Sequence, residues 1–473
     1  MSSPATIQSA IAAHRFGLGE ASLAPLQGDP QGWLLAQIGP ADAPRGEGLL
    51  STAQALNLLA AERVTRQAAR APQAAAGANT MAEPPLANPY RETILADVRS
   101  RLLTAAATPR PFAERLQLFW CNHFTVSLAK GSTRGLVGAF ERDAIRPRIA
   151  GSFETLLLAA TTHPAMLRYL DNVLSAGPRS RIVARAAQRA AGTGEGPRVT
   201  GLNENLAREV LELHTLGAES GRGQSAPGSG YTQADVTAFA RVLTGWRVGS
   251  GSGASASAFD PAWHEPGRKT VLGKDYAEGA DGLRLLLHDL AQHPATARFI
   301  ATKLARHFVA DDPPAALVER LAAVYLRDEG QLAEVYRELV RNPEAWNASP
   351  AKLKTPEELV VSTARMLGPD QRQFERSGAG GVQALGQRLH AAPSPAGWSD
   401  RGEDWLGPDA VWKRVEWAAR VADRAGRAID ARALAGNSLG ELLSPATAQQ
   451  IERAADGSQA LALLLLAPEF QRR

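Results

Sequence analysis

The sequence of 473 residues contains a single cysteine, Cys121. One thiol cannot form an internal disulfide, and a zinc site built from cysteine ligands is excluded as well. Cys121 lies in an aromatic segment with helical periodicity, where cysteine is ordinarily a small buried hydrophobe rather than a nucleophile. The chain therefore lacks any cysteine-based chemistry that the sequence could reveal.

Long hydrophobic runs are also missing, since no stretch of about 18 apolar residues occurs. We therefore expect no transmembrane helix. Residues 1–17 lack a basic region followed by an apolar one, so no secretory signal is visible. A cytoplasmic location is the default expectation, and export stays open.

The charges are nearly balanced, with 52 basic and 48 acidic residues and a net charge of +4. This balance, without a long basic stripe, argues against a nucleic-acid partner. A glycine-rich phosphate loop, a Gly-x-Ser-x-Gly elbow and a dinucleotide fingerprint are all missing. We therefore predict no cofactor, and the partner is an unknown substrate or an unknown protein.

Helical periodicity dominates what is present, and no segment shows convincing strand alternation. Hydrophobic residues make up 44% of the chain, which is ample for a core. We predict an all-α fold in which residues 1–473 form one large multi-helix globular unit with long loop insertions. Capping patterns at Thr232 and Thr355 mark two helix starts. The main predicted helices are 111–128, 137–149, 153–174, 204–216, 232–246, 279–290, 295–309, 315–329, 331–341, 355–367, 381–390 and 409–427.

Four insertions have biased compositions that are typical of mobile surface loops. Residues 72–86 are rich in alanine and proline, 177–200 in arginine, and 220–230 and 249–258 in glycine and serine. Such loops could form a lid over a rigid site or be tolerated insertions. The arginine-rich loop could attract an anionic substrate or simply be solvated.

The most informative segment is the predicted helix 203–217, which carries two amides, three carboxylates, an arginine and a histidine. At 100° per residue its apolar stripe is flanked on both sides by polar residues, as in a helix that borders a cleft. Gly217 is expected to end the helix. The apolar stripe consists of Leu206, Val210, Leu213 and Gly217. One polar flank consists of Asn205, Glu209 and Glu212, and the other flank consists of Asn203 and His214.

Two interpretations of this helix stay open. Buried carboxylates and amides must find partners, so the residues could form a structural polar network. Alternatively, a glutamate at the edge of an apolar stripe, such as Glu209, has its pKa raised toward the range useful for acid or base catalysis. The spacing matches neither Glu-x-x-His nor His-Glu-x-x-His, so a metal interpretation is weak here.

Other candidate residues lie outside this helix. His123 shares a helical face with aromatic residues and points toward the core, where most histidines are structural. His264 stands in a loop with two acids and Lys269, and loops on a helical frame often hold function. Arg241 could bind a carboxylate. The tryptophans after Pro393, namely Trp398, Trp405 and Trp412, could stack on sugars or close a core.

Several motifs together resemble the bacterial DUF1800 family, a large group of uncharacterised proteins. They span almost the whole chain in order. The resemblance implies one helical unit and gives no established activity, substrate or catalytic residue. The matching segments are His14-Arg15-Phe16-Gly17-Leu18-Gly19, Phe119–Phe124, Asn203-Glu204-Asn205 through Gly217, Tyr231-Thr232-Gln233 through Trp246, His264 with Gly267 and Lys269, and Ala467-Pro468-Glu469-Phe470-Gln471.

Two segments depart from the family pattern. The family's His-Asp is His264-Glu265 here, so a carboxylate is kept at that position. The usual Pro-Asn-Val-Lys-Gly-Trp is Pro393–Trp398 here and lacks the Asn and the Lys, which weakens a role for that loop. Many relatives look exported, which leaves the compartment of this chain open.

We hypothesise an acid/base enzyme, hydrolase-like, that acts on a polar substrate, with a polymeric one as an option, at a cleft around helix 203–217. Glu209 would be the acid or base, His214 or His264 its partner, and His123 a supporting residue. Alternatives are a non-enzymatic scaffold with a buried polar network, or a metal site assembled from histidines and glutamates. The predicted substrate-binding residues are Asn203, Asn205, Arg208, Glu212, Arg241, Trp246 and Lys269.

Overall fold

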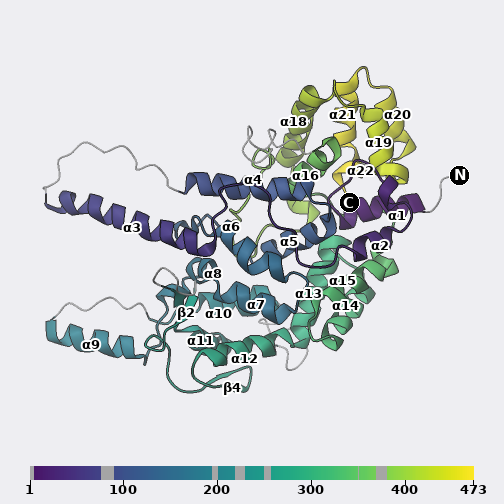
Figure 1. Ribbon diagram of the computed structural model, residues 1–473. Helices are drawn as coiled ribbons and strands as arrows, with labels where there is room; N and C mark the ends of the chain where they lie inside the picture. Colours follow the sequence, from purple (N-terminus) through teal and green to yellow (C-terminus); the bar gives the residue numbers. More distant parts are fainter. Residues whose placement is uncertain are drawn as a thin grey trace.

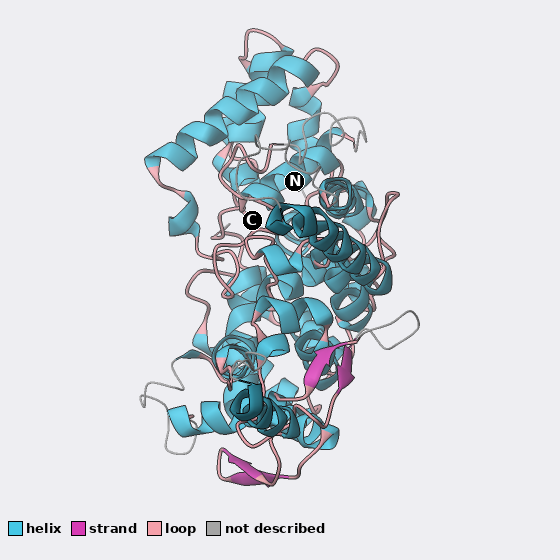
Figure 2. Cartoon of the chain, turned by 90° about the vertical axis from the view of Figure 1, so that its left-hand side faces the viewer, coloured by secondary structure: helices cyan, strands magenta, loops and turns pink. Residues whose placement is uncertain are grey.

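A computed structural model describes residues 5–75, 90–193, 201–218, 230–249, 257–349, 351–368 and 381–473. Helices dominate it, as Figures 1 and 2 show, which confirms the predicted all-α class. Two hydrophobic cores lie side by side. The larger core occupies the body in the lower part of Figure 1, and the smaller core lies among the yellow-green helices above it.

The larger core is built from the N-terminal and middle helices. The long helices α3 and α9 project from the body on the same side of Figure 1. The helices of this part are α1 Ala5–Ile11, α2 Pro30–Leu35, α3 Thr52–Ala75, α4 Arg91–Ala107, α5 Pro111–His123, α6 Val137–Phe140, α7 Phe153–Thr162, α8 Pro164–Tyr169, α9 Arg181–Thr193, α10 Asn205–Glu209, α11 Gln233–Leu243, α12 Ala280–Ala291, α13 Pro294–Phe308, α14 Ala315–Arg327 and α15 Leu332–Arg341.

The smaller core combines the C-terminal helices with one face of α4, because Leu102 packs with Leu359 of α16 in the same cluster. Helix α18 packs closely on α21 within it. Helix α4 also contacts α5 and α6 of the larger core, so it lies between the two cores. The C-terminal helices are α16 Pro356–Leu367, α18 Pro408–Ala425, α19 Ala431–Leu439, α20 Pro445–Glu452, α21 Gly457–Leu466 and α22 Pro468–Gln471.

Two short antiparallel hairpins were not expected from the sequence. Strand β1 (Trp246–Val248) pairs with β2 (Ser257–Phe259), and β3 (Lys269–Val271) pairs with β4 (Lys274–Tyr276). Three-residue strands are too short for alternation to reveal them. The sequence does offer one signal for the second hairpin, which is Gly273 in the turn between β3 and β4. Leu272 and Gly273 both have positive φ there, as a tight hairpin turn requires.

The predicted helix starts at Thr232 and Thr355 are confirmed, since both make a capping box. Several predicted helices were wrong in extent or absent; among them, the predicted helix 111–128 ends at His123. The predicted helix 153–174 ends at Thr162 and restarts at Pro164, because a proline excludes the helical conformation from the residue before it. Residues 381–390 form turns instead of a helix.

The prediction of a mobile loop at 177–200 was wrong for Arg181–Thr193, which form α9. Its repeated alanines and arginines favour a helix, and the arginine bias concealed this propensity. Residues 257–258 of the predicted loop 249–258 pair in β2, and residues 72–75 continue α3. The parts 76–86, 194–200, 220–229 and 250–256 lie outside the described residues. No helix among the described segments is long and apolar enough to cross a membrane.

Within the segments that the structure describes, three helices contain π-helical turns, at Ala12–Phe16, Glu141–Ile145 and Val210–Thr215. A π-turn adds one residue to a helical turn and rotates every later side chain, and such turns often occur at functional sites. Two of them carry histidines, His14 and His214, in segments that resemble the family pattern.

Candidate functional site

The predicted helix 203–217 is α10 followed by the π-turn Val210–Thr215. The extra residue changes the predicted faces. Leu206 and Val210 are buried as predicted, but Leu213 is only partly buried, and Leu211 and His214 take the inner face. A period of 3.6 residues cannot predict this shift. Gly217, with φ of 90°, ends the helix as predicted.

His214 is buried next to His123 of α5. The His123 Nε2 donates to the backbone oxygen of His214 at 3.1 Å, and the two rings lie 6.0 Å apart. The Nδ1 of His123 and both ring nitrogens of His214 have no hydrogen-bond partner among the described residues. Burial lowers the pKa of His214 to about 3, and Lys303 lowers it further. Both imidazoles are therefore neutral at pH 7.

Glu209 lies half-buried on the other side of the same helix. Burial raises the pKa of Glu209, Glu212 adds to this, and Arg208 opposes it. Burial raises the pKa values of the Tyr169 and Tyr231 hydroxyls, and the negative charge of Glu209 raises them further. The raised pKa agrees with the acid/base hypothesis in direction, but the described structure brings no histidine against this carboxyl group.

His264 is held at both ring nitrogens. Its Nδ1 donates to the backbone oxygen of Thr244 at 2.7 Å, and its Nε2 accepts from the Lys269 Nζ at 2.8 Å and from the Gly279 N–H at 3.2 Å. Lys269 also donates to the backbone oxygen of Glu265. With these partners, His264 and Lys269 tie the loop to the end of α11, and their predicted functional roles gain no support from the geometry.

The other predicted substrate-binding residues lie around α10 and α11 and do not converge on one site. The side chain of Asn203 accepts from the Asn205 N–H at 2.9 Å, which fixes the start of α10. Arg208 binds the side chain of Gln233 at 2.8 Å. Arg241 is exposed, and Trp246 is buried at the start of β1. These roles stay predictions.

A cavity of about 270 Å³ lies elsewhere, at the seam between the two cores. Its walls come from α4, α5, α13, the start of α16 and the loop 387–401. His123 is the one predicted catalytic residue in its lining, and Glu209, His214 and His264 are not part of it. The lining residues are Leu18, Arg101, Arg115, Leu118, Phe119, Asn122, His123, Lys303, Arg306, His307, Thr355, Glu357, Glu358, Gln387, Ala396, Trp398, Ser399, Asp400 and Arg401.

His307 and Asp400 form a dyad in this wall. The His307 Nδ1 lies 3.0 and 2.9 Å from the two carboxylate oxygens of Asp400. Its Nε2 has no partner among the described residues. Burial lowers the pKa of His307 and outweighs the opposing effect of Asp400. The imidazole is therefore neutral at pH 7, with the proton on Nδ1 and the lone pair on Nε2.

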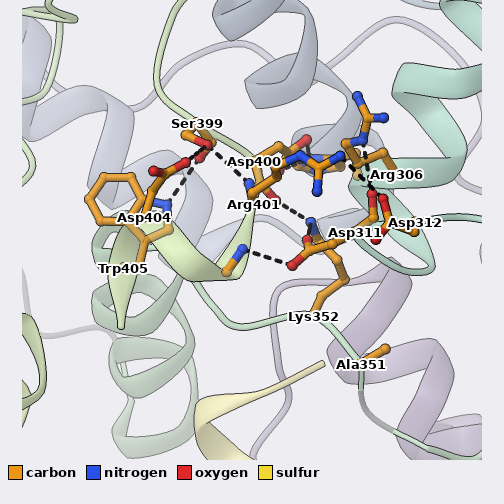
Figure 3. A network of polar contacts seen from close by, with 12 residues as sticks. Arg306, Asp311, Asp312, Ala351, Lys352, Ser399, Asp400, Arg401, Asp404 and Trp405 are labelled. Atoms are coloured by element: carbon orange, nitrogen blue, oxygen red, sulfur yellow. Dashed lines mark hydrogen bonds and ion pairs between the residues drawn. The ribbon is translucent and has the colours of Figure 1, made fainter. Parts of the chain in front are cut away.

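Asp400 stays ionised because a hydrogen bond and two cations favour its charged form. Burial alone would raise its pKa, but the hydrogen bond from His307 and the charges of Lys352 and Arg473 outweigh burial and hold the pKa below its usual range. Lys352 is fully buried and donates to the backbone oxygen of Asp400 and to the side chain of Asp311. Figure 3 shows these contacts, which fix the Asp400 segment against the end of α13. These contacts of Lys352 therefore hold the Asp400 side of the dyad in place.

Buried ion pairs cross the seam beside the dyad. Arg115 of α5 pairs with Glu358 of α16 and donates to the Gly17 backbone oxygen at 2.6 Å. Its Nη2 has no partner among the described residues. Arg101 of α4 binds Glu357 and Glu141, each at 2.5 Å. These ion pairs therefore link α4 and α5 to α16 across the cavity wall in the absence of a ligand.

The aromatic segment of α5 fixes the loop that carries Asp400. The Asn122 Nδ2 donates to the Trp398 backbone oxygen at 2.8 Å, and the Trp398 N–H donates to the Asn122 side chain at 2.8 Å. Gly397 has φ of 82°, and a Cβ there would lie 2.6 Å from the Asn122 backbone oxygen. A glycine is therefore required for this close approach. The family-like segment Phe119–Phe124 thus meets the divergent segment Pro393–Trp398 at the cavity.

Sequence reasoning missed His307, Asp400 and Lys303. A signal existed for α13, where Lys303, Arg306 and His307 follow the i, i+3, i+4 spacing of one helical face. Asp400 stands two residues after Trp398 and was passed over because the loop lacks the family's Asn and Lys. Their meeting could not be predicted, because 93 positions separate His307 from Asp400.

Among the described residues, no group of three His, Cys, Asp or Glu side chains is placed to hold a metal ion. The convergence of at least three of His123, Glu209, Glu212, His214 and His264 that a metal site needs is therefore not found there. The polar groups at the seam are instead arranged as ion pairs and one histidine–aspartate dyad.

The fold and the cavity define a helical protein with two cores and a charged, partly enclosed pocket between them. A profile of the family described as "Protein of unknown function (DUF1800)" matches residues 11–472, nearly the whole chain. The chain belongs to the DUF1800 family, which confirms the resemblance. It has no significant match among functionally curated proteins or among solved structures.

Proposed function

We propose that this protein is an acid/base enzyme, hydrolase-like, that acts on a polar substrate in the cavity between the two cores. One observation carries the proposal. His307 is partly buried, is oriented through Nδ1 by an ionised Asp400, and keeps Nε2 without a partner among the described residues in the wall of a 270 Å³ cavity. A histidine held in this way is suited to general-base catalysis.

The reaction follows from these groups. His307 Nε2 takes a proton from a water molecule as the water oxygen bonds to an electrophilic centre of the substrate. Asp400 then stabilises the imidazolium through the Nδ1–H bond, and His307 returns the proton to the leaving group. Nearby cations, Lys303 among them, stabilise negative charge that develops on the substrate. Water is the nucleophile because the cavity's Ser399 hydroxyl donates to Asp404 and the Thr355 side chain caps α16.

The kind of substrate follows from the lining. Arg, Lys, Asp, Glu, Asn and Gln dominate it, so the ligand is polar. Trp398 adds a flat apolar surface, on which the C–H face of a sugar or an aromatic ring could stack. A cavity of this size holds one small unit, so a polymer would enter by its end or by a single residue.

The experiment is a hydrolysis screen of the full chain with ester, amide and glycoside substrates, comparing wild type with His307→Gln and Asp400→Asn. We expect each variant to lose a factor of about 10²–10⁴ in kcat/KM. The matched control is His288→Gln, because His288 is half-exposed and also contacts a carboxylate, Glu154. Full activity of His307→Gln on a substrate that the wild type cleaves would contradict the proposal.

The same screen tests the hypothesis centred on Glu209. Loss of activity in Glu209→Gln, together with normal activity in His307→Gln, would place the reacting groups on the helix 203–217 instead of the cavity. In the reverse result, Glu209 would belong to a surface cluster outside the chemistry.

A scaffold function is the second candidate, and the buried ion pairs favour it. Arg101 is satisfied by two carboxylates, Glu141 and Glu357, and these contacts tie α4 to neighbouring helices. Such a network can serve structure alone. Under the scaffold function, His307→Gln would change stability but no substrate in the screen would be cleaved by any form of the protein.

A further inference from the structure

The chain uses lysine sparingly. Of its 52 basic side chains, seven are lysines, at positions 130, 269, 274, 303, 352, 354 and 413. Five of them have a polar partner: Lys130 with Asp171, Lys269 with His264, Lys274 with Asp289, Lys352 with Asp311 and Lys413 with Asp409. Lys303 and Lys354 remain, and neither makes a hydrogen bond or ion pair among the described residues.

These two lysines differ in what surrounds them. Lys354 is fully buried with its Nζ 4.0 Å from the centre of the Phe470 ring, and it does not line the cavity. Lys303 is partly buried and lines the cavity, and its nearest described cation–π contact is a distant one, 5.6 Å from Phe299. Lys303 is therefore a cation that faces the pocket without a counter-ion bound to it.

The charges around the cavity are uneven. Five Arg or Lys residues line it against three carboxylates. Glu357 and Glu358 are paired with Arg101 and Arg115. Arg306 donates to the backbone oxygen of Asp311 and pairs with no carboxylate among the described residues. The surplus positive charge thus lies on one face of α13, at Lys303 and Arg306, beside His307.

A third donor points to the same kind of ligand. The guanidinium of Arg115 is 1% exposed, yet its Nη2 has no partner among the described residues. A buried charged donor without a partner costs free energy unless something else satisfies it. A negatively charged ligand group would supply the acceptor that this donor and Lys303 lack.

We propose that the cavity binds an anionic group of the substrate, a carboxylate or a phosphate, through Lys303, Arg306 and the free Nη2 of Arg115. This inference rests on the proposed function in that it names the substrate class of the same pocket. It places the anion next to His307 on α13, so that the neighbouring electrophilic centre lies within reach of the base.

The titration of Lys303 gives the binding a pH dependence. Burial lowers its pKa to about 8, Arg306 adds to this, and Asp400 opposes it. The groups that interact with Lys303 are Arg306 on α13, His123 on α5, His214 on the π-turn 210–215 and Asp400 on the loop. Both histidines are neutral, so the ammonium form persists below pH 8. Anion binding should therefore weaken as the pH rises through 8.

The test is isothermal titration calorimetry of the full chain with inorganic phosphate and with acetate, at constant ionic strength. We expect at least one anion to bind the wild type at pH 7, and the stronger of the two identifies the group. Lys303→Met should weaken its binding about tenfold or more. Lys303→Arg keeps the charge at all these pH values, so it should bind at pH 9 where the wild type has weakened.

Two further variants sharpen the result. Arg298→Gln removes an exposed cation from the same helix, paired with Glu319, and should leave binding unchanged. His307→Gln should abolish hydrolysis but keep anion binding, so failure of the proposed function and failure of this inference are distinguishable. Circular dichroism checks that each variant is folded. No binding of either anion to the wild type, or equal binding by Lys303→Met, would overturn the inference.

Discussion

At the scale of single residues, shifted pKa values determine which groups are charged near pH 7, and His307 is the first case. Its pKa is lowered by burial, so it loses its function as a base only when the pH falls below the ordinary histidine value of about 6.5. We expect kcat/KM to fall on the acid side, at a pH below 6.5. A pH–rate profile with a substrate found in the screen measures this. In Asp400→Asn the remaining activity should not show the same acid limb, because the imidazole loses the partner that fixes its tautomer.

Glu209 offers a second test at this scale. Its pKa is raised by burial and by Glu212, so the folded protein holds this proton more tightly than the unfolded chain. The ionised form therefore costs stability, and this cost appears as the pH rises through the raised pKa. Glu209→Gln should melt at or slightly above the wild type at pH 7, by on the order of 1 °C, with the difference vanishing near pH 4. A drop of several degrees at pH 7 would mark Glu209 as a member of a structural network.

Lys354 is the third case, because its burial favours the neutral amine whereas its contact with the Phe470 ring favours the ammonium. A lysine over a Phe470 ring suits an ammonium, but full burial, with Arg115 and Arg473 nearby, lowers its pKa far below the ordinary value. We favour the neutral amine, because burial and the neighbouring arginines outweigh the opposing charge of Glu358. A lowered pKa costs stability as the pH falls from the unfolded value, so Lys354→Met should stabilise by about 1 kcal/mol at pH 7 and less at pH 10. Thermal unfolding at both pH values decides, and a marked loss of stability would favour the ammonium.

At the scale of the element, the junction between the π-turn 210–215 and α13 positions the cavity wall. A Cβ on Gly217 would lie 2.9 Å from the ring of Phe299, one turn before Lys303, and the φ of 90° disfavours any other residue. Gly217→Ala should destabilise by about 1–3 kcal/mol through strain and overpacking. Gly386→Ala is the matched control, because its φ is 99° with open space around it, so only backbone strain remains. Equal losses of melting temperature in both variants would show that the contact with Phe299 has no cost of its own.

The sequence predicted those elements whose signals are local. The capping boxes at Thr232 and Thr355 depend on residues three apart, and the all-α class depends on a period repeated along the chain. The π-turn at 210–215 defeats this period, which is why the predicted inner face included Leu213 instead of His214. The three-residue strands carry too little alternation to be recognised.

At the scale of the whole molecule, the cavity exists because distant segments meet, and local signals cannot encode that meeting. Asn122 and Trp398 are 276 positions apart, and Arg115 and Glu358 are 243 apart. Chemistry-bearing residues could be recognised in the sequence, His123 among them, but their partners could not. The pairing of His307 with Asp400 is a property of how the two cores pack together.

The Arg115–Glu358 pair also predicts how the two cores unfold. Both side chains are buried, on α5 and α16 respectively, and burial alone would raise the Glu358 pKa, but Arg473 and Arg115 hold it below its usual range. Arg115→Met leaves a buried carboxylate with one cation fewer, which should cost about 3–5 kcal/mol. Arg320→Met is the control, because Arg320 is an exposed partner of Glu338 and its loss should cost less than about 1 kcal/mol.

Because Arg115 contacts both cores, its loss should weaken their coupling as well as the total stability. Hydrogen exchange with mass spectrometry in mild denaturant measures this, by comparing peptides from α14 in the larger core with peptides from α21 in the smaller one. In the wild type we expect both sets to open together. In Arg115→Met the α21 peptides should exchange first, since the smaller core has fewer apolar residues to hold it folded alone. Simultaneous opening in the variant would mean that the contacts of α4 with α5 and α6 join the cores, and that the charged seam is kept for the ligand.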